Sequence, residues 1–312
     1  MLGLESPKTE TRMQHNQPRF MDPQFFRTDQ FRAADEEKQA FAQDLARDGV
    51  AIIDPRIPEF EMVASEVVRE TTRLQPGAGR LQDAWRRIDS VRSVAVAGHA
   101  MEMLAFAYGR QPVPFQTLNF TLGTQQRTHS DTIHFDSYPA NFMCGVWTAF
   151  EDTDENNGAL HYYPGSHRLT AMALEDFGIS AGGYWNRNQV AQQYERALAE
   201  YVATMGLTKR VIPLRKGQAL VWTANLFHGG EPILDKSRTR YSQVTHFYFE
   251  DCLHTQPLWS DLHGGRIMYK KVFDIARNRY ITPMYNGKAF RLPLESHLRE
   301  FLVAKVIGVR KS

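Results

Sequence analysis

The sequence lacks most of the features that mark specialised classes of protein. Its 312 residues contain only two cysteines, Cys144 and Cys252, and neither lies in a CxxC or similar ligand spacing. This excludes a disulfide scaffold and favours a reducing, cytoplasmic setting. No stretch approaches the roughly 18 apolar residues of a membrane-spanning helix, and the first residues lack an apolar core of signal-peptide length. We therefore expect no membrane span and no leader.

An excess of charge of either sign is also lacking. The chain has 37 Lys and Arg against 35 Asp and Glu, a formal net charge of +2. Without a long basic block there is no electrostatic reason to expect nucleic acid or a membrane as a partner. The composition, with 42% hydrophobic and 12% aromatic residues, is that of an ordinary globular protein and not of a disordered or collagen-like chain.

The first third of the chain is helical in pattern. Residues 1–35 are polar with scattered charge and predict a flexible arm or a cover that orders late in folding. Apolar residues at helical spacing then predict helices over 36–49, 59–74 and 91–109, with a short buried strand at 50–55.

From about residue 112 to 250 the pattern changes to short runs of β-branched and aromatic residues separated by turn residues. Such runs lie at 115–123, 142–152, 158–165, 210–214, 218–225 and 241–250. Their spacing is typical of a sandwich or jelly roll, interrupted by a helical insert at about 189–206. We predict a single mostly-β domain over 36–312, in which 251–312 is a C-terminal extension ending in a helix at 294–308.

Residues 127–139, RTHSDTIHFDSYP, contain the pattern His-x-Asp twice, as His129 with Asp131 and as His134 with Asp136. Residues i and i+2 of a strand point the same way, so each pair would present an imidazole and a carboxylate together. The two histidines are five residues apart (134 − 129 = 5), so on one continuous strand the pairs would face opposite sides. Only one pair can then face the interior, and spacing alone leaves both open.

A third ligand must come from elsewhere, and His228 in WTANLFHGG ends a predicted strand before two glycines that permit close backbone approach. Two histidines and one carboxylate suit ferrous iron, since they leave coordination positions open for a co-substrate and dioxygen. Arg240, at the start of the last strand, has a planar fork that grips a carboxylate in two hydrogen bonds. Each pattern is short, and a lone histidine is also a common structural residue.

Four blocks occur in order: FQTLNFTLGTQQRTHSD, a tryptophan strand leading to Asn-Gly and Pro-Gly-Ser-His, LVWTANLFHGG, and an arginine opening YSQVTHFYF. With these blocks, residues 112–250 resemble the phytanoyl-CoA dioxygenase-like family of iron(II)/2-oxoglutarate oxygenases. The resemblance implies a double-stranded β-helix (jelly roll, cupin-like) that uses Fe(II), 2-oxoglutarate and O2. It also implies a small-molecule substrate that is hydroxylated at an unactivated C–H, with release of succinate and CO2.

The resemblance selects between the two His-x-Asp pairs. In the family this motif lies well upstream of the strand tryptophan, and the separation of 18 from His129 (147 − 129) fits better than that of 13 from His134 (147 − 134). It implies that His129, Asp131 and His228 bind the metal and that the second pair lies at the pocket mouth. Family halogenases replace this carboxylate with a small residue, so Asp131 favours hydroxylation, or a related desaturation or ring closure.

For the co-substrate, the resemblance assigns Arg240 and not Arg238, because the residues after Arg240 reproduce the final strand. Trp147 corresponds to a position beside 2-oxoglutarate, although a core aromatic residue would explain it equally well.

The chain departs from the family at one position. Several relatives have a serine two residues after the distal histidine, where this chain has Gly230. Asn119 and Thr121, alternate residues on the strand before the motif, are candidates for the missing polar contact, although both also suit ordinary strand positions.

Two other functions stay open on the sequence. A cupin-like Zn or Mn isomerase or hydrolase that does not use oxygen would explain the three ligands but would leave Arg240 without a role. A non-catalytic jelly-roll binding protein is the second alternative. The substrate is not predicted; loops over 168–189 and beyond Asp251 are candidate pocket walls.

Overall fold

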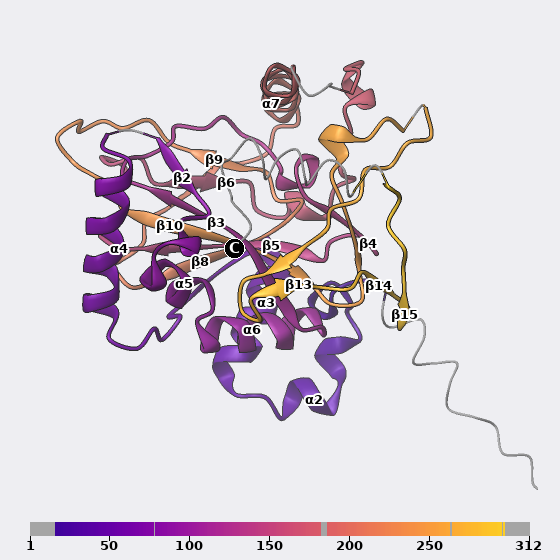
Figure 1. Cartoon of the computed structure of the whole chain (residues 1–312), viewed down its shortest axis with the longest axis horizontal. Helices are drawn as coiled ribbons and strands as arrows, with labels where there is room; N and C mark the ends of the chain where they lie inside the picture. Colours follow the sequence, from indigo (N-terminus) through magenta and orange to yellow (C-terminus); the bar gives the residue numbers. More distant parts are fainter. Residues whose placement is uncertain (1–15, 78, 182–185, 263, 295, 297–312) are drawn as a thin grey trace, which may run out of the picture.

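The computed structural model describes residues 16–77, 79–181, 186–262, 264–294 and 296. Two antiparallel sheets form a double-stranded β-helix, which confirms the predicted fold class (Figure 1). The larger sheet contains, in spatial order, β1 (Val50–Ile53), β8 (Ala219–Thr223), β5 (Met143–Ala149), β10 (Ser242–Phe249), β3 (Pro112–Phe120) and β2 (Arg80–Gln82). The smaller sheet contains β7 (Arg210–Ile212), β6 (Leu160–Tyr162) and β9 (His228–Gly230).

Helices cover the outer face of the larger sheet. The helices are α2 (Asp29–Arg32), α3 (Glu36–Asp48), α4 (Phe60–Leu74), α5 (Asp89–Ala95), α6 (Gly98–Tyr108) and α7 (Arg187–Thr204). Residues of α3, α5 and α6 form one apolar cluster with the outward side chains of β5, β8 and β10, whereas α7 lies on the opposite side of the molecule (Figure 1). Strands β5, β8 and β10 are therefore buried on both faces, which explains the mostly apolar sequences of β5 and β8.

The helix borders follow local chemistry. Helix α3 begins after Asp35, whose carboxylate accepts a hydrogen bond from the Lys38 backbone N–H at 2.8 Å, a standard N-cap. It ends at Gly49, which has a left-handed backbone with φ of +80°. The predicted helical insert is confirmed as α7, but the predicted helix over 91–109 is two helices, because α5 ends at Ala95 and α6 starts at Gly98. The predicted C-terminal helix lies almost wholly outside the described residues.

The remaining short elements lie in the connections and the C-terminal extension. Three two-stranded ladders pair β4 (Asp136–Tyr138) with β11 (Leu253–Thr255), β12 (Phe273–Asp274) with β13 (Arg279–Tyr280), and β14 (Met284–Tyr285) with β15 (Lys288–Ala289). The 3₁₀ turns are η1 (Arg19–Met21), η2 (Phe25–Arg27), η3 (Ala84–Arg86), η4 (Asp131–Ile133), η5 (Ser166–Arg168), η6 (Glu175–Phe177) and η7 (Pro257–Trp259). Within the described parts of the chain, no helix is long and apolar enough to cross a membrane.

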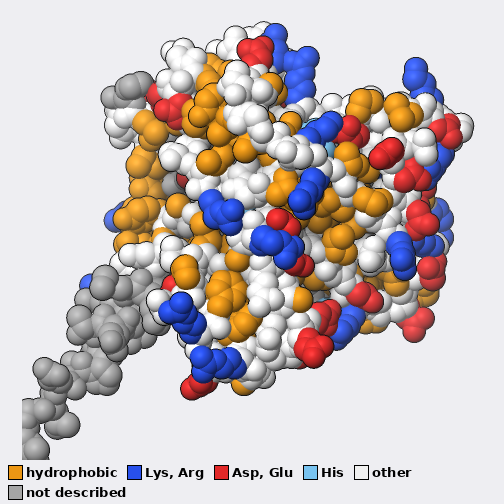
Figure 2. All heavy atoms as spheres, turned by 180° about the vertical axis from the view of Figure 1, so that it is seen from behind, with side chains coloured by type: hydrophobic (Ala, Val, Ile, Leu, Met, Phe, Trp, Pro, Cys, Tyr) orange, Lys and Arg blue, Asp and Glu red, His pale blue; other side chains and the backbone are white. Residues whose placement is uncertain are grey.

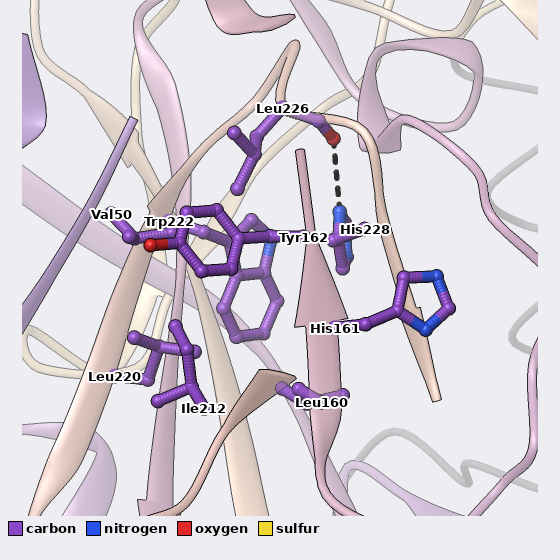
Figure 3. Close-up of a pocket in the computed structure, with 9 residues that line it drawn as sticks. All are labelled: Val50, Leu160, His161, Tyr162, Ile212, Leu220, Trp222, Leu226 and His228. Atoms are coloured by element: carbon purple, nitrogen blue, oxygen red, sulfur yellow. Dashed lines mark hydrogen bonds between the residues drawn. The ribbon is translucent and has the colours of Figure 1, made fainter. Parts of the chain in front are cut away.

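The space between the two sheets is filled with side chains. Inward residues of the larger sheet, including Trp147, Trp222 and Val244, form an apolar cluster with Tyr162 of β6. A residual cavity of about 10 Å³ lies between residues of this cluster and the imidazoles of His161 and His228 (Figure 3). Such a volume holds at most about one water molecule, so this part of the interior is a packed core.

Of the two alternatives for residues 1–35, the packing of residues 16–35 agrees with a cover over the core and not with a free arm. Phe20, Phe25 and Phe31 are at most 5% exposed and belong to the main apolar cluster. The Phe20 ring meets the Tyr108 ring of α6 edge-on, with centroids 5.1 Å apart. These phenylalanines come from short 3₁₀ turns and one-turn helices, so no helical or strand periodicity in the sequence reveals that they are buried.

Phe20→Ala tests this packing. Removing a phenylalanine that is fully buried against the core should lower the free energy of unfolding by about 3–5 kcal/mol, measured by chemical denaturation. Met62→Ala, at a side chain that is 63% exposed, should change it little. Equal stability of Phe20→Ala and wild type would show that the segment around Phe20 does not pack on the core.

Candidate metal centre

The two candidate histidine ligands are brought together by backbone pairing. His129 and His228 are antiparallel bridge partners. The His129 N–H donates to the His228 carbonyl at 2.9 Å, and the His228 N–H donates to the His129 carbonyl at 3.0 Å. Side chains of directly opposed residues in an antiparallel pair lie on the same face, and the two imidazole rings are 4.4 Å apart, centroid to centroid. The loop before η4 therefore extends the smaller sheet at the edge formed by β9.

Both imidazoles are held with one nitrogen facing the centre of the group. Nδ1 of His129 is 2.9 Å from the Arg127 carbonyl, and Nδ1 of His228 is 3.0 Å from the Leu226 carbonyl (Figure 3). A carbonyl only accepts, so each Nδ1 carries the proton and each Nε2 presents a lone pair. Burial, with the nearby His129, lowers the pKa of His228 to about 4, so this ring is neutral near pH 7.

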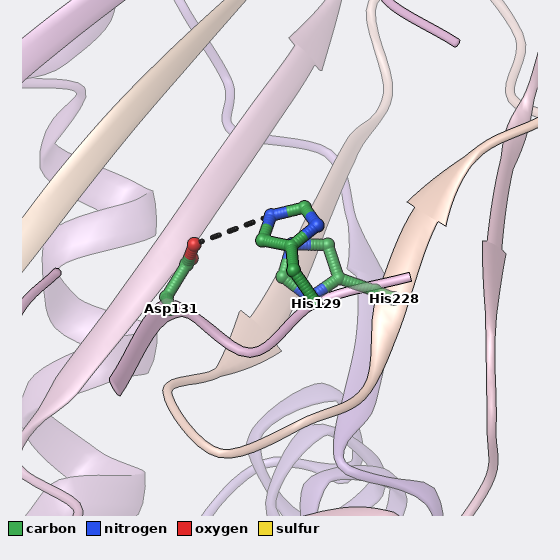
Figure 4. A group of neighbouring side chains, drawn as sticks. All are labelled: His129, Asp131 and His228. Atoms are coloured by element: carbon green, nitrogen blue, oxygen red, sulfur yellow. Dashed lines mark ion pairs between the residues drawn. The ribbon is translucent and has the colours of Figure 1, made fainter. Parts of the chain in front are cut away.

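Asp131 completes the group as the first residue of η4 (Figure 4). Its Oδ1 is 3.6 Å from Nε2 of His129, and its Oδ2 accepts a hydrogen bond from the Trp222 indole N–H at 2.8 Å. Burial alone would raise the pKa of Asp131, but His129, His228 and His246 together hold this pKa well below its ordinary value. The carboxylate is therefore charged, although it is only 6% exposed.

These three residues fit a divalent metal. Each offers one ligand atom, and the three atoms lie within 4.8 Å of one another. The set combines two imidazole nitrogens with one carboxylate, and backbone carbonyls fix both ring orientations, as is usual for histidine ligands. Two histidines and one carboxylate are the donors typical of non-haem Fe(II) sites.

His134 and Asp136 do not join this group. The chain turns through η4 directly after Asp131, so His134 does not continue a strand, and the alternation argument does not apply to it. Asp136 begins β4. Its Oδ1 accepts from the Ser137 N–H at 2.8 Å, and burial raises its pKa to about 6.

Arg240 lies buried two residues before β10, beside Trp147. Its guanidinium carbon is 5.1 Å from the centroid of the Trp147 ring, and Nη1 donates to the Gly158 carbonyl at 2.5 Å. Its Nε is buried and has no hydrogen-bond partner among the residues described. Burial lowers the pKa of Arg240 to about 10, so the side chain is still charged at neutral pH.

Arg238 has a different environment. Its Nη1 donates to both carboxylate oxygens of Asp154, at 2.8 and 2.7 Å, in a pair that is part-exposed at the surface. Its charge is thus already matched by a neighbouring residue.

The side chains of Asn119 and Thr121 have other partners, although the Arg240 backbone N–H donates to the Thr121 carbonyl at 2.9 Å. On β3, Leu118 and Phe120 face the interior cluster, so Asn119 faces the helices, where its amide donates to Gln243 at 3.1 Å. The Thr121 hydroxyl donates to the Gly77 carbonyl at 2.7 Å. The contact of these residues with the co-substrate stays a prediction, which these side-chain hydrogen bonds do not support.

Gly230 has a structural explanation. A Cβ at this position would lie 3.1 Å from the Gln125 backbone N and 3.3 Å from the Gln126 backbone N. The Gly230 N–H also donates to the Gln126 carbonyl at 2.9 Å. The close approach of these two backbones favours glycine over serine here.

The sequence analysis did not identify the residues of the larger sheet that face the Asp131 carboxylate. Trp222 on β8 and His246 on β10 are both buried and point toward its carboxylate. Nδ1 of His246 is 3.1 Å from Oε1 of Gln116, which fixes the ring. The only available signal was Gly145, since glycine inside a strand often marks a close approach.

The fold and the donor set define a metal-binding protein of the double-stranded β-helix class. A model of the phytanoyl-CoA dioxygenase (PhyH) family matches residues 22–240, well over half of the chain. The chain therefore belongs to this family. It is similar to the peroxisomal phytanoyl-CoA dioxygenase of Bos taurus, with 27% identity over 155 residues, which cover 49% of this chain and 41% of the bovine protein. The match thus spans about two-fifths of that relative's length.

Solved structures share the fold at low sequence identity. The carbocyclase SnoK of nogalamycin biosynthesis, described as non-heme and alpha-ketoglutarate-dependent, aligns with a TM-score of 0.54 at 15% identity, covering 85% of this chain and 96% of SnoK. The epimerase SnoN of the same biosynthesis, in complex with Fe3+, alpha-ketoglutarate and nogalamycin RO, aligns with a TM-score of 0.52 at 16% identity. This alignment covers 69% of this chain and 85% of SnoN.

The visible surface agrees with the balanced composition. On the face shown in Figure 2, basic and acidic side chains are interspersed among hydrophobic ones. This distribution matches the formal net charge of only +2.

Asp136→Asn tests the environment assigned to the second pair. An acid whose pKa is about 6 when folded and about 3.9 when unfolded destabilises the fold once it ionises. Wild type should therefore lose stability relative to Asp136→Asn as the pH rises from about 4 to 6, by roughly 1–3 kcal/mol. Denaturation of both proteins at pH 4 and 7 measures this difference. A constant difference would show that Asp136 ionises normally.

Proposed function

We propose that this protein is an Fe(II)/2-oxoglutarate-dependent dioxygenase that hydroxylates an unactivated C–H of a small molecule. The observation that carries the proposal is a pair of matched features in one buried interior. His129, Asp131 and His228 converge on a metal position, and Arg240 has a buried Nε without a partner in the described structure. The first feature suits iron, and the second suits a carboxylate.

The residues connecting the two features also support the proposal. Trp222 contacts Asp131 and belongs to the same interior cluster as Trp147, over which the Arg240 guanidinium lies. A dicarboxylic 2-oxo acid needs a metal at its oxo end and a cation at its far end. The guanidinium lies over Trp147 and is only 2% exposed, and a hydrogen bond to a charged group is stronger where water is excluded.

The protein residues would bind and orient, while the metal supplies the redox chemistry. Fe(II) at this site would couple dioxygen and 2-oxoglutarate to substrate oxidation, with succinate and CO2 as co-products. His129, Asp131 and His228 would hold the metal from one side, leaving its other positions for co-substrate and dioxygen. Arg240 would fix the direction in which 2-oxoglutarate lies.

Hydroxylation is the reaction we favour, since Asp131 keeps the carboxylate that family halogenases lack. The related solved structures include an epimerase and a carbocyclase, so epimerisation and ring closure are the reactions that a product analysis must distinguish from it. A Zn or Mn enzyme that does not use oxygen would share the three ligands but would give Arg240 no role, and it would not consume 2-oxoglutarate.

Asp131→Ala should abolish metal-dependent binding of 2-oxoglutarate, because one of three ligands is lost. The measurement is an anaerobic titration of metal-free protein with Fe(II) and 2-oxoglutarate, following the visible iron-to-co-substrate charge-transfer band. Wild type and Asp136→Asn should both give the band. A folded wild-type protein that binds metal without it would favour the oxygen-independent metalloenzyme, and a band retained in Asp131→Ala would remove the ligand assignment.

Arg240→Ala should raise the 2-oxoglutarate concentration needed for half-maximal binding about tenfold to hundredfold. This corresponds to the 1.5–3 kcal/mol of a charge-assisted hydrogen bond. Arg238→Ala is the matched control, because its partner is Asp154, and it should leave this concentration unchanged. If instead Arg238→Ala raises this concentration and Arg240→Ala leaves it unchanged, Arg238 holds the co-substrate.

A further inference from the structure

The two oxygens of Asp131 have different surroundings. Oδ1 faces Nε2 of His129 at 3.6 Å. Oδ2 faces the larger sheet, where it accepts from the Trp222 indole N–H at 2.8 Å. The next polar atom from that sheet, Nε2 of His246, is 3.8 Å from Oδ2, beyond ordinary hydrogen-bond distance. Of these two neighbours, only the indole is a hydrogen-bond donor to Oδ2.

Three neighbouring strands build this contact in register. Gly145 of β5 is the direct partner of Trp222 on β8 and of His246 on β10. A Cβ on Gly145 would lie 2.2 Å from Cζ2 and 2.3 Å from Cε2 of the Trp222 indole. Any side chain at residue 145 would therefore displace the indole. The absence of a side chain at this one position allows the indole to reach Asp131.

We propose that Trp222 is a positioning residue that holds Asp131 as a one-oxygen metal ligand, and that Gly145 provides the space for it. The inference rests on the proposed function, because it assumes a metal at the site. The indole N–H is a donor only, so it engages Oδ2 without competing for the metal and without exchanging protons. Oδ1 is left for the metal, and the carboxylate is kept from closing on it with both oxygens.

The role of such a contact is measurable at the metal. Loss of a hydrogen bond to a ligand that binds metal typically weakens metal affinity 10- to 100-fold. Trp222→Phe keeps most of the ring volume but removes the N–H, and we expect it to bind Co(II) about 10- to 100-fold more weakly than wild type. Competition with a chelator gives the affinity, and the visible Co(II) absorption reports a change in coordination. Unfolding of the metal-free variant is measured alongside.

The chain offers a matched control. Trp85 also donates its indole N–H to a carboxylate, Oδ1 of Asp83, at 3.2 Å. It belongs to the main apolar cluster, between the helices and the larger sheet, and not to the cluster between the two sheets. Trp85→Phe should leave Co(II) affinity and the Co(II) spectrum unchanged. If it weakens Co(II) as much as Trp222→Phe does, the effect is a general loss of packing and the proposal is overturned.

Gly145→Ala tests the same contact without touching the indole, and carries the test if Trp222→Phe does not fold. The new methyl group should push the indole from Asp131 and weaken Co(II) binding to a similar extent. Adding Gly145→Ala to Trp222→Phe should weaken binding by less than the two single losses combined, because the indole N–H contact that both changes remove can be lost only once, and such non-additivity identifies a shared contact. Fully additive losses would contradict the proposal.

The outcomes separate this inference from the proposed function. If wild type gives the Fe(II)/2-oxoglutarate band and Trp222→Phe binds Co(II) as tightly as wild type, only the positioning role fails. If folded wild type binds neither Co(II) nor Fe(II), the proposed function fails, and this inference with it.

Discussion

The site depends on two backbone hydrogen bonds, those that join His129 and His228 in both directions. These residues are 99 positions apart in the chain (228 − 129), and the bridge places their side chains on one face. Asp131 follows His129 by two residues, and its own N–H donates to the Ala224 carbonyl. The segments between the ligands, including α7, can vary without moving them, because the backbone of the smaller sheet and not the loops sets their spacing. This arrangement is how a jelly roll carries a fixed metal site with variable surroundings.

Much of the fold was readable because its signals are local. Strand runs and the helical insert were predicted near their observed positions, since turn residues and apolar periodicity mark them. The buried segment 16–35 was not readable, because Phe20, Phe25 and Phe31 lie in turns without periodicity. The choice of the first His-x-Asp pair rested on family register. Our geometric reason for that motif was wrong, because η4 interrupts the strand and cross-strand pairing, not alternation, brings the ligands together.

The position of Asn119 shows what strand alternation cannot predict. Alternation states that Asn119 and Leu118 point to opposite faces, but not which face is the interior. In a strand with one solvent-exposed face, the polar residues identify that face and the apolar residues identify the interior. Strand β3 is buried on both faces, with helices on one side and the barrel interior on the other, so a polar residue can face either. Only the contacts of Gln243, which accepts from Asn119 and donates to the Val91 carbonyl of α5, decide it.

Buried polar groups in the interior show where a ligand is expected. The imidazoles of His129 and His228 are satisfied at Nδ1 by carbonyls, and Oδ2 of Asp131 is satisfied by an indole. A buried donor without an acceptor costs about 1–3 kcal/mol, and Nε of Arg240 is such a donor. The same guanidinium keeps its charge without a carboxylate at hydrogen-bond distance in the described structure. The fold therefore carries an unfavourable term at Arg240, which a carboxylate bound there, as we propose, would remove.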